Sequence, residues 1–448
     1  PYAVVNTRTK ELDYPQGDQN VYASYAGTGG VPLGGSLTRL AFMYRFGDLP
    51  LALSTDITPQ SRIMFYRSVP DRLSHIAPFL TFDRDPYLVL ADGRLFWIVD
   101  GYTTSSAYPY SQPAAGLNYI RNSVKAVVDA YSGATQLYVI DPSDPIVRTY
   151  AQVFPGVFQP MSTMPPVLVA HLRYPVDLFL VQAQIYDTYH MTDPRVFYNR
   201  EDVWATPNEL FAGAQQPLDP YYVNLHLDPA VGDEFALILP FTPSGKDNMV
   251  AWMAGRSDAP NYGRLLVYRF PKDRTVFGPM QIEARINQDP GISAQLTLWN
   301  QQGSRVIRGN LLVVPIADAL LYIEPLYLQA EGSALPELKR VIVAYGTQIS
   351  METTLEQALG RVFGGLQQSS TLTSPAPAPS APAAAPGAPA ASGETPAPSP
   401  RVAALIAEAN SDYERAQAAL RAGDFAAYGR DVAALGRVLQ QLKQATGP

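Results

Sequence analysis

A proline-rich stretch at residues 371–400 constrains the fold of this 448-residue chain more than any other feature. Nine of its residues are proline, and most of the others are alanine, serine or glycine. Such a composition buries too little apolar area to fold and favours extended, polyproline II-like conformations. The sequence therefore predicts a disordered linker at 371–400 between a folded body, residues 1–370, and a tail at 401–448.

Strand signals dominate the body. They are clearest at Tyr87–Val99, where Asp92-Gly93 can adopt the positive φ angles of a tight hairpin turn. A second hairpin is predicted at Val124–Ile140, with its turn at Ser132-Gly133. Further alternating or apolar runs predict strands at Glu234–Pro240, Arg264–Phe270, Gln281–Ile286, Ala294–Trp299, Gly309–Val314 and Val341–Tyr345.

Helices are fewer. Apolar spacing predicts one at Ser36–Phe46, a first-turn proline predicts one at Pro175–His190, and a capping box at Thr353–Glu356 opens one that runs to Phe363. In the tail, Gly423-Asp424 separates two helical segments. The predicted fold is α+β and β-rich, with antiparallel sheets, a few packed helices and a C-terminal helical hairpin. The predicted divisions are 1–230, 231–370, the linker at 371–400 and the hairpin at 401–448.

Composition excludes several classes of function. The net charge of −7 and the lack of a basic run interleaved with aromatics argue against nucleic-acid binding. The chain has no cysteine, which excludes disulfides and thiolate chemistry and is compatible with an oxidising compartment. The longest apolar run, near Leu311–Ile323, is shorter than a membrane span requires. The sequence also lacks the common hydrolase, metalloprotease and nucleotide-binding motifs, so enzymatic activity is not indicated and no cofactor is predicted.

A series of ordered motifs resembles the bacterial uncharacterised protein family 0182 (UPF0182). The resemblance extends over the whole body and into the tail. The motifs that carry it include Tyr2–Thr7, Glu11–Pro15, Arg62–Arg67, Ala77–Leu80, Asp85–Tyr87, Trp97–Thr104, Tyr108–Ser111, Asn118–Lys125, His171–Pro175, Pro240–Pro243, Gly309–Leu312 and Leu321–Leu328.

The resemblance implies a location and an architecture but no catalytic residues. Members of that family are large multi-pass membrane proteins in which N-terminal helices precede a large soluble region. This chain is then expected to be the soluble C-terminal region, outside the cytoplasmic membrane, with the upstream transmembrane helices as its first partner. The start at Pro1-Tyr2-Ala3, without an initiator Met, agrees with a segment of a longer product.

A dense aromatic and polar stretch follows the first hairpin and is suited to stacking on a sugar or docking a protein surface. Packing in the core is the alternative for these tyrosines. The binding candidates in and around it are Asp100, Tyr102, Tyr108, Tyr119 and Arg121.

Two further sets of residues are candidates for a site. A polar pocket is predicted around two histidines, with structural hydrogen bonding as the alternative; its members are His171, Arg173, Tyr174 and His190. Several carboxylates near the first hairpin would suit a cation such as Ca²⁺, with ordinary turn and strand-end roles as the alternative; they are Asp83, Asp85, Asp92 and Asp100.

Three hypotheses for function follow. The first is a non-enzymatic extracytoplasmic module that binds envelope proteins or polymers, or assembles as a homo-oligomer. The second is a cell-envelope hydrolase or transferase that uses scattered carboxylates with His171 or His190. The third is a module that binds a cation or a glycan at the Asp83–Asp100 hairpin or at the tyrosine-rich stretch that follows it.

Overall fold

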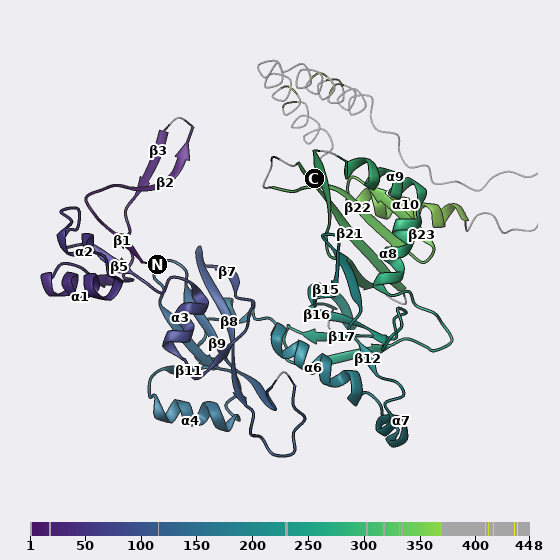
Figure 1. Cartoon of the computed structure of the whole chain (residues 1–448), viewed down its shortest axis with the longest axis horizontal. Coiled ribbons are helices and arrows are strands. Elements are labelled where there is room, and N and C mark those ends of the chain that lie inside the picture. The colour runs from purple at the N-terminus through teal and green to yellow at the C-terminus, as the bar shows by residue number, and fades with distance from the viewer. Residues whose placement is uncertain are drawn as a thin grey trace, which may run out of the picture. The chain divides into compact units, whose positions relative to one another are not determined.

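The structure is a computed structural model that describes residues 2–369, except 18, 115, 229–231, 302, 317–318, 331 and 333–334, together with 408, 411, 415, 434 and 437. The chain divides into two compact units, Pro1–Thr373 and Ser374–Pro448 (Figure 1). The predicted linker and, apart from those five single positions, the predicted helical hairpin lie outside the described residues. The following description concerns the first unit.

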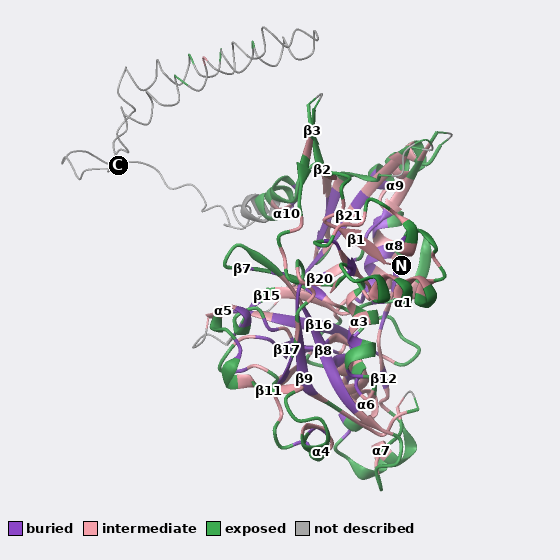
Figure 2. Cartoon of the chain, turned by 90° about the vertical axis from the view of Figure 1, so that its left-hand side faces the viewer, coloured by how far each residue is buried: buried purple, intermediate pink, exposed green. Residues whose placement is uncertain are grey.

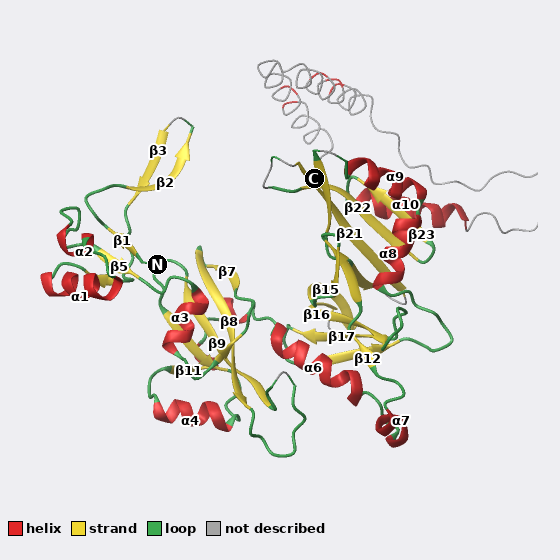
Figure 3. Cartoon of the chain, in the orientation of Figure 1, coloured by secondary structure: helices red, strands yellow, loops and turns green. Residues whose placement is uncertain are grey.

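The fold is α+β and rich in antiparallel strands, as predicted (Figure 3). Its first large sheet has the order β11-β10-β9-β8-β6, with β7 also paired to β8. The strands are β6 (Thr81–Phe82), β7 (Tyr87–Ala91), β8 (Arg94–Ser105), β9 (Tyr119–Asp129), β10 (Thr135–Val139) and β11 (Phe158–Pro160).

Both predicted hairpins lie in this sheet. Ala91 pairs with Arg94, so Asp92 and Gly93 form a two-residue turn, and their φ angles are 49° and 73°. β9 and β10 form the second hairpin, with Gly133 at a φ of 71° in the turn. In both turns the sequence supplies residues that tolerate the left-handed region.

Successive side chains of β8 and β9 point to opposite faces of the sheet, and apolar residues are buried on both faces. One face buries Val99, Val124 and neighbours against α3 (Val69–Ile76) and α4 (Pro145–Val153). The other buries Ile98 and Val127 beneath α5 (Pro166–Val169). Figure 2 shows that buried residues concentrate along these long strands. The two strands are therefore rigid over most of their length.

Two more five-stranded sheets follow, and their strands share one apolar core that includes Ile238 and Ile342. The first has β12 (Trp204–Ala205), β15 (Tyr221–Asp228), β16 (Gly232–Pro243), β17 (Ala251–Arg256) and β18 (Leu265–Arg269). The second has β19 (Ser304–Arg308), β20 (Leu312–Ile316), β21 (Ala319–Ala330), β22 (Glu337–Tyr345) and β23 (Gln348–Glu352).

Residue 230, where the sequence suggested a division of the body, lies between β15 and β16, which pair with each other. Helix α6 (Val176–Tyr189) packs Phe179 and Ala183 against the opposite face of β16 and β17. Helix α10 (Leu355–Ser369) packs Ala358 and Val362 against β22.

The remaining elements are small. They comprise the sheet of β1 (Ala3–Val5), β4 (Val31–Pro32) and β5 (Arg62–Met64), the pair β2 (Glu11–Gln16) and β3 (Gln19–Ala23), the pair β13 (Asn208–Phe211) and β14 (Ala214–Pro217), the 3-10 helix η1 (Met161–Thr163), and the helices α1 (Ser36–Phe46), α2 (Pro50–Leu53), α7 (Pro194–Asn199), α8 (Pro279–Gln288) and α9 (Pro290–Trp299). No helix in the described part of the chain has the length and apolar character needed to cross a bilayer.

Two predicted strands are wrong, because Gln281–Ile286 lies in α8 and Ala294–Trp299 lies in α9. A spacing of four residues, as between Ile282 and Ile286, fits both a strand face and a helix face, so apolar periodicity alone did not separate them. The decisive signals are prolines in the first turn of each helix and Asp289, which caps α9 by accepting from Ile292 N at 3.0 Å.

The predicted helices at Ser36–Phe46 and Pro175–His190 correspond to α1 and α6. The last predicted helix, α10, continues to Ser369. Its cap lies one residue later than predicted, since Thr354 Oγ1 accepts from Gln357 N at 3.3 Å.

Truncating the buried face of α8 tests its place in the core. We expect Ile282→Ala, at a fully buried site, to lower the free energy of unfolding by about 2–5 kcal/mol. Leu298→Ala on α9, at a side chain that is 61% exposed, is the control and should change it by less than about 1 kcal/mol. Urea unfolding followed by circular dichroism measures both, and equal effects would contradict the assigned faces.

Candidate functional site

Several predicted site residues meet at the start of α6, in a group that we call the junction cluster. Its members are Asp83, Asp85, Asp100, Tyr102, Lys125, Arg173, Tyr174 and Asp177. Asp100 and Lys125 are direct partners across β8 and β9, and their buried side chains form an ion pair.

The ion pair ties the first sheet to the segment that leads into α6. Lys125 Nζ also donates to the carbonyl oxygen of Arg173 at 3.1 Å and lies 5.4 Å from the ring centroid of Tyr262. Burial raises the pKa of Asp100, and Lys125 opposes that shift. The pair is thus a buried, hydrogen-bonded anchor for the backbone at Arg173.

Asp83 makes a second tie to the same segment. Its carboxylate accepts from Tyr102 OH, from Asp177 N at 3.0 Å and from Asp85 N at 2.9 Å. The Asp177 N–H belongs to the first turn of α6, where a carboxylate is favoured by unsatisfied donors and the helix dipole. An ion pair at 3.0 Å between Arg84 and Asp177 adds to this contact.

Arg173 and Tyr174 have packing roles in this cluster. The guanidinium of Arg173 lies 4.4 Å from the ring centroid of Tyr87 and 5.3 Å from that of Tyr222. Tyr174 donates its N–H to Ser257 Oγ at 3.0 Å and its hydroxyl to Gln182 Oε1 at 2.6 Å. These contacts occupy the polar groups that a ligand would otherwise use.

The four candidate aspartates do not form a cation site. Asp92 lies in the β7–β8 turn, whereas Asp83 and Asp100 are each engaged by protein donors. In the residues that the structure describes, no set of three or more His, Asp or Glu side chains is arranged to hold a metal ion. Asp92 therefore has a turn role, whereas Asp100 forms a buried ion pair within β8 and Asp83 accepts a hydrogen bond from the first turn of α6.

The two candidate histidines lie in different surroundings. His171 is exposed between α5 and α6. His190 is buried, its ring stacks on Trp204 with centroids 3.7 Å apart, and its Nδ1 lies 3.1 Å from the carbonyl oxygen of Tyr186. Burial lowers the pKa of His190, so the imidazole is neutral near pH 7. Among the described residues no hydrogen bond or ion pair joins the two.

Three other predicted residues form, with the neighbouring Tyr110, a partly exposed surface that we call the tyrosine platform: Tyr108, Tyr119 and Arg121. The rings of Tyr108 and Tyr119 stack with centroids 5.2 Å apart, and the Arg121 guanidinium lies 5.8 Å from the Tyr119 ring. Tyr108 is 52% exposed and Tyr110 is fully exposed. The platform therefore offers aromatic faces and a cation to solvent.

Local hydrogen bonds hold the loop that carries Tyr108 and Tyr110. Asn118 accepts from Tyr108 N at 2.9 Å through its side chain and donates to Tyr108 O at 2.7 Å. Ser111 Oγ donates to Asn118 O at 2.6 Å. Asn118 thus closes the loop between β8 and β9 and fixes the Tyr108 backbone beside Tyr119.

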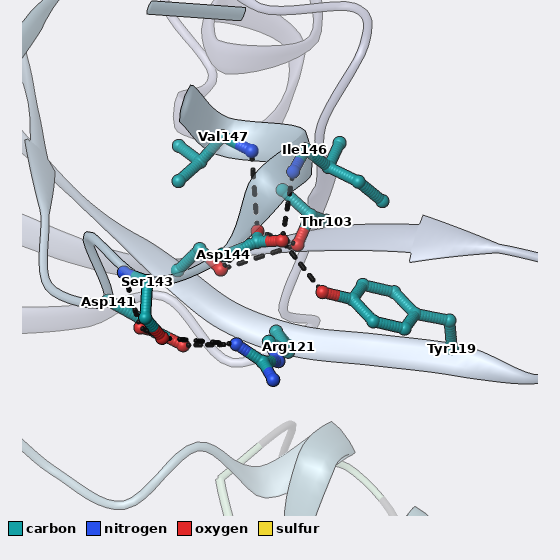
Figure 4. Close-up of polar contacts among 9 residues, drawn as sticks. Thr103, Tyr119, Arg121, Asp141, Ser143, Asp144, Ile146 and Val147 are labelled. Atoms are coloured by element: carbon teal, nitrogen blue, oxygen red, sulfur yellow. Dashed lines mark hydrogen bonds and ion pairs between the residues drawn. The ribbon is translucent and has the colours of Figure 1, made fainter. Parts of the chain in front are cut away.

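A buried carboxylate beneath the platform fixes Tyr119 (Figure 4). Asp144 caps α4 by accepting from Ile146 N at 3.0 Å, and it also accepts from Tyr119 OH at 2.7 Å. The hydroxyls of Thr103, at 2.5 Å, and Ser123, at 2.7 Å, donate to the same carboxylate. Burial alone would raise the pKa of Asp144, but these hydrogen bonds lower it overall.

Arg121 is held separately. Its guanidinium contacts the Asp141 carboxylate at 3.1 Å and Ser143 Oγ at 3.3 Å (Figure 4). Both partners lie in the turn just before α4. The platform is therefore preorganised by β8, β9 and the α4 N-terminus, and its groups suit recognition rather than bond-breaking chemistry.

The sequence analysis missed one further site. A cleft of about 680 Å³ is lined by β15, β17, β18, the loop after β18, and β20 to β22. Trp252 and Tyr268 are cross-strand partners in its wall, and their rings stack at 4.4 Å. Trp252 and Tyr268 lie 16 positions apart on different strands, and no local sequence pattern predicts their contact. It becomes evident only from the pairing of β17 with β18.

Together these features define a β-rich α+β protein with a rigid, exposed aromatic surface and a separate cleft. The chain belongs to the uncharacterised protein family UPF0182, whose family model matches residues 1–299.

The chain is similar over nearly all of its length to curated relatives from distant organisms. It is 50% identical to a UPF0182 protein of Pelotomaculum thermopropionicum, covering 100% of this chain and 47% of the relative. A UPF0182 protein of Methanospirillum hungatei is 46% identical, covering 98% of this chain and 48% of the relative. The chain thus spans about half the length of the curated relatives it matches. No solved structure matches.

Separating the partners of the junction ion pair tests its role. We expect Lys125→Met to cost about 3–5 kcal/mol of unfolding free energy, because Asp100 is left buried and unpaired. The double variant Asp100→Leu/Lys125→Met should recover at least half of that loss. Arg361→Met, at an exposed ion pair with Glu352, is the control and should cost less than about 1 kcal/mol. A double variant no more stable than the single one would contradict the assignment.

The pH dependence of stability tests the Asp144 cluster. Because the pKa of Asp144 is lowered by folding, its contribution is present above the pKa of an unfolded Asp, near 3.9, and is lost as pH falls through the folded value. Asp144→Asn keeps a capping oxygen but removes the charge, so the variant should lose less stability than wild type between about pH 5 and pH 2. Asp144→Ala should cost about 2–4 kcal/mol at pH 7. Urea unfolding across this pH range measures both, and parallel curves for wild type and Asp144→Asn would refute the pKa shift.

Proposed function

We propose that this chain is a non-catalytic, extracytoplasmic binding module of a larger multi-pass membrane protein, and that its tyrosine platform docks a partner protein. The observation that carries the proposal is the stack of exposed Tyr108, from the loop between β8 and β9, on Tyr119, whose hydroxyl is held by buried Asp144. The location outside the membrane rests on the family resemblance.

The chemistry of the platform favours a protein partner. The segment from Ser105 to Arg121 contains three Tyr and three Ser, residue types that are also enriched in antibody paratopes. Tyr and Arg are also the side chains that most often dominate protein–protein binding energy. Because Tyr119 and Arg121 are already held in place, less conformational entropy is lost on docking.

The competing functions have less support. Among the candidate residues that the structure describes, Asp83 and Asp100 accept hydrogen bonds from protein donors and His190 is buried against Trp204. A glycan is the other class of ligand that stacks on tyrosine rings. Both alternatives are separated from protein docking by the following experiment.

Site-specific photo-crosslinking tests the docking surface. A benzophenone amino acid placed at Tyr110 in the full-length membrane protein, irradiated in cells, should give a protein adduct of defined mass. The same group at Tyr198, which is 87% exposed on α7, is the matched control and should give none. Tyr108→Ala with Arg121→Gln should lower the yield at position 110 by at least tenfold.

The other outcomes are informative as well. Equal adducts at positions 110 and 198 would mean nonspecific capture and would contradict the proposal. An adduct to carbohydrate alone at position 110 would replace the partner protein with an envelope glycan. A thermal melt of each variant confirms that the fold is intact.

A further inference from the structure

A second cleft lies where the small sheet of β1, β4 and β5 meets α3 and the turn between β9 and β10, and we call it the N-terminal cleft. Its volume of about 640 Å³ lies within the roughly 300–1,000 Å³ of typical ligand pockets. The ring side chains in its lining are Tyr25, Phe65, Tyr66, His75, Trp97 and Tyr131. These walls suit a ligand with a flat, apolar body.

Hydrogen bonds between the walls preform this cleft. Arg72 on α3 donates to Gly133 O at 3.1 Å and so joins that helix to the β9–β10 turn. Tyr25 OH donates to Tyr131 O at 3.3 Å, and Ala26 N donates to Tyr131 OH at 3.0 Å. The segment before β4 is thereby tied to the same turn. A ligand would therefore meet a cavity that needs little reorganisation.

Two arginines of the cleft lack an anionic partner among the described residues. Arg72 is half-buried, and its guanidinium donates to two carbonyl oxygens, those of Gly133 and, at 3.4 Å, Phe65. Arg67 is an exposed residue of the lining, and within the described part of the chain its side chain makes no hydrogen bond or ion pair. A guanidinium that is partly removed from water and has no counter-ion favours the binding of an anion.

The other charged groups of the lining are already paired. Asp129 is the one carboxylate among the lining residues that the structure describes, and it forms an ion pair with Arg94 at 2.5 Å. His75 Nδ1 lies 3.4 Å from the Asp71 carboxylate, and the imidazole stacks on Tyr66 with centroids 3.8 Å apart. Two guanidinium charges therefore remain uncompensated in the cleft, and an anionic ligand complements them electrostatically.

We propose that the N-terminal cleft binds a phosphate monoester carried on an aromatic ring. The phosphate contacts Arg67 and Arg72, and the ring packs beside Tyr131. A phosphate monoester carries about two negative charges at neutral pH, so it matches two guanidiniums, whose planar forks bind phosphate oxygens through charge-assisted hydrogen bonds. A carboxylate carries one charge and leaves one guanidinium without a counter-ion. The inference is independent of the tyrosine platform and goes beyond partner docking.

Calorimetric titration of the whole 448-residue chain with naphthyl phosphate at about pH 7.5 tests the site. The ligand should bind, and Arg67→Gln should weaken binding about tenfold, because a charge-assisted hydrogen bond is lost. Arg195→Gln, at an exposed arginine on α7 outside the cleft, is the matched control and should leave the affinity unchanged.

Two comparison ligands isolate the role of charge. Naphthalenesulfonate has the same ring with one negative charge and should bind roughly tenfold more weakly than naphthyl phosphate. Naphthol has no charge and should bind wild type and Arg67→Gln equally. Three results would overturn the proposal: no binding of naphthyl phosphate, equal weakening in Arg67→Gln and Arg195→Gln, or naphthalenesulfonate binding as tightly as the phosphate.

Two further measurements locate the ring and its source. Tyr131→Ala removes a ring from the wall and should weaken naphthyl phosphate, whereas Tyr131→Phe keeps the ring and should bind as wild type does; equal affinity in the two variants would contradict the place assigned to the ligand ring. Vesicles of phosphatidic acid carry a phosphate monoester without an aromatic ring. The protein should not sediment with them, and sedimentation that Arg67→Gln abolishes would replace the aromatic body with a membrane lipid. Urea unfolding of each variant verifies that lost binding is not lost folding.

Discussion

The ion pair between Asp100 and Lys125 supports the arrangement of the elements around it. Asp100 on β8 and Lys125 on β9 are cross-strand partners in the interior, and Lys125 also donates a hydrogen bond to the backbone carbonyl oxygen of Arg173. Asp83, which precedes β7 and β8 in the sequence, accepts a hydrogen bond from Asp177 N. This bond fixes the first turn of α6, a few residues after Arg173. Since α6 covers β16 and β17, the position of that sheet depends on these few buried polar bonds as well as on apolar packing.

Buried carboxylates have a common use in this molecule. Asp83 and Asp144 each accept hydrogen bonds from more than one element, and Asp100 accepts from Lys125 on the neighbouring strand. At the junction cluster the result is a buried set of hydrogen bonds at the start of α6. Beneath the tyrosine platform, the buried carboxylate of Asp144 orients an aromatic ring. Asp144 accepts a hydrogen bond from the Tyr119 hydroxyl only, so the face of the Tyr119 ring stacks with Tyr108.

Local signals in the sequence were sufficient for the hairpins, where Asp92-Gly93 and Gly133 occupy positive-φ positions. They failed at α8 and α9, where the spacing of Ile282 and Ile286 is ambiguous. The sequence analysis placed Asp100 and Tyr102 in one set of candidates and Arg173 and Tyr174 in another, whereas the structure brings the four together although 70 residues of chain separate the pairs. Such contacts depend on strand pairing and helix docking, and no pattern within a single segment encodes them.

The fully enclosed pair on β8 and β9 also limits how this sequence can drift over evolutionary time. Replacing either Asp100 or Lys125 alone leaves an unpaired charge in the buried interior and destabilises the fold. We therefore expect a substitution at one position to be tolerated only with a compensating substitution at the other. The ion pair between exposed Arg361 and half-buried Glu352 is under no such restriction. Substitutions at Asp100 and Lys125, which lie 25 positions apart in the chain, are therefore expected to be correlated.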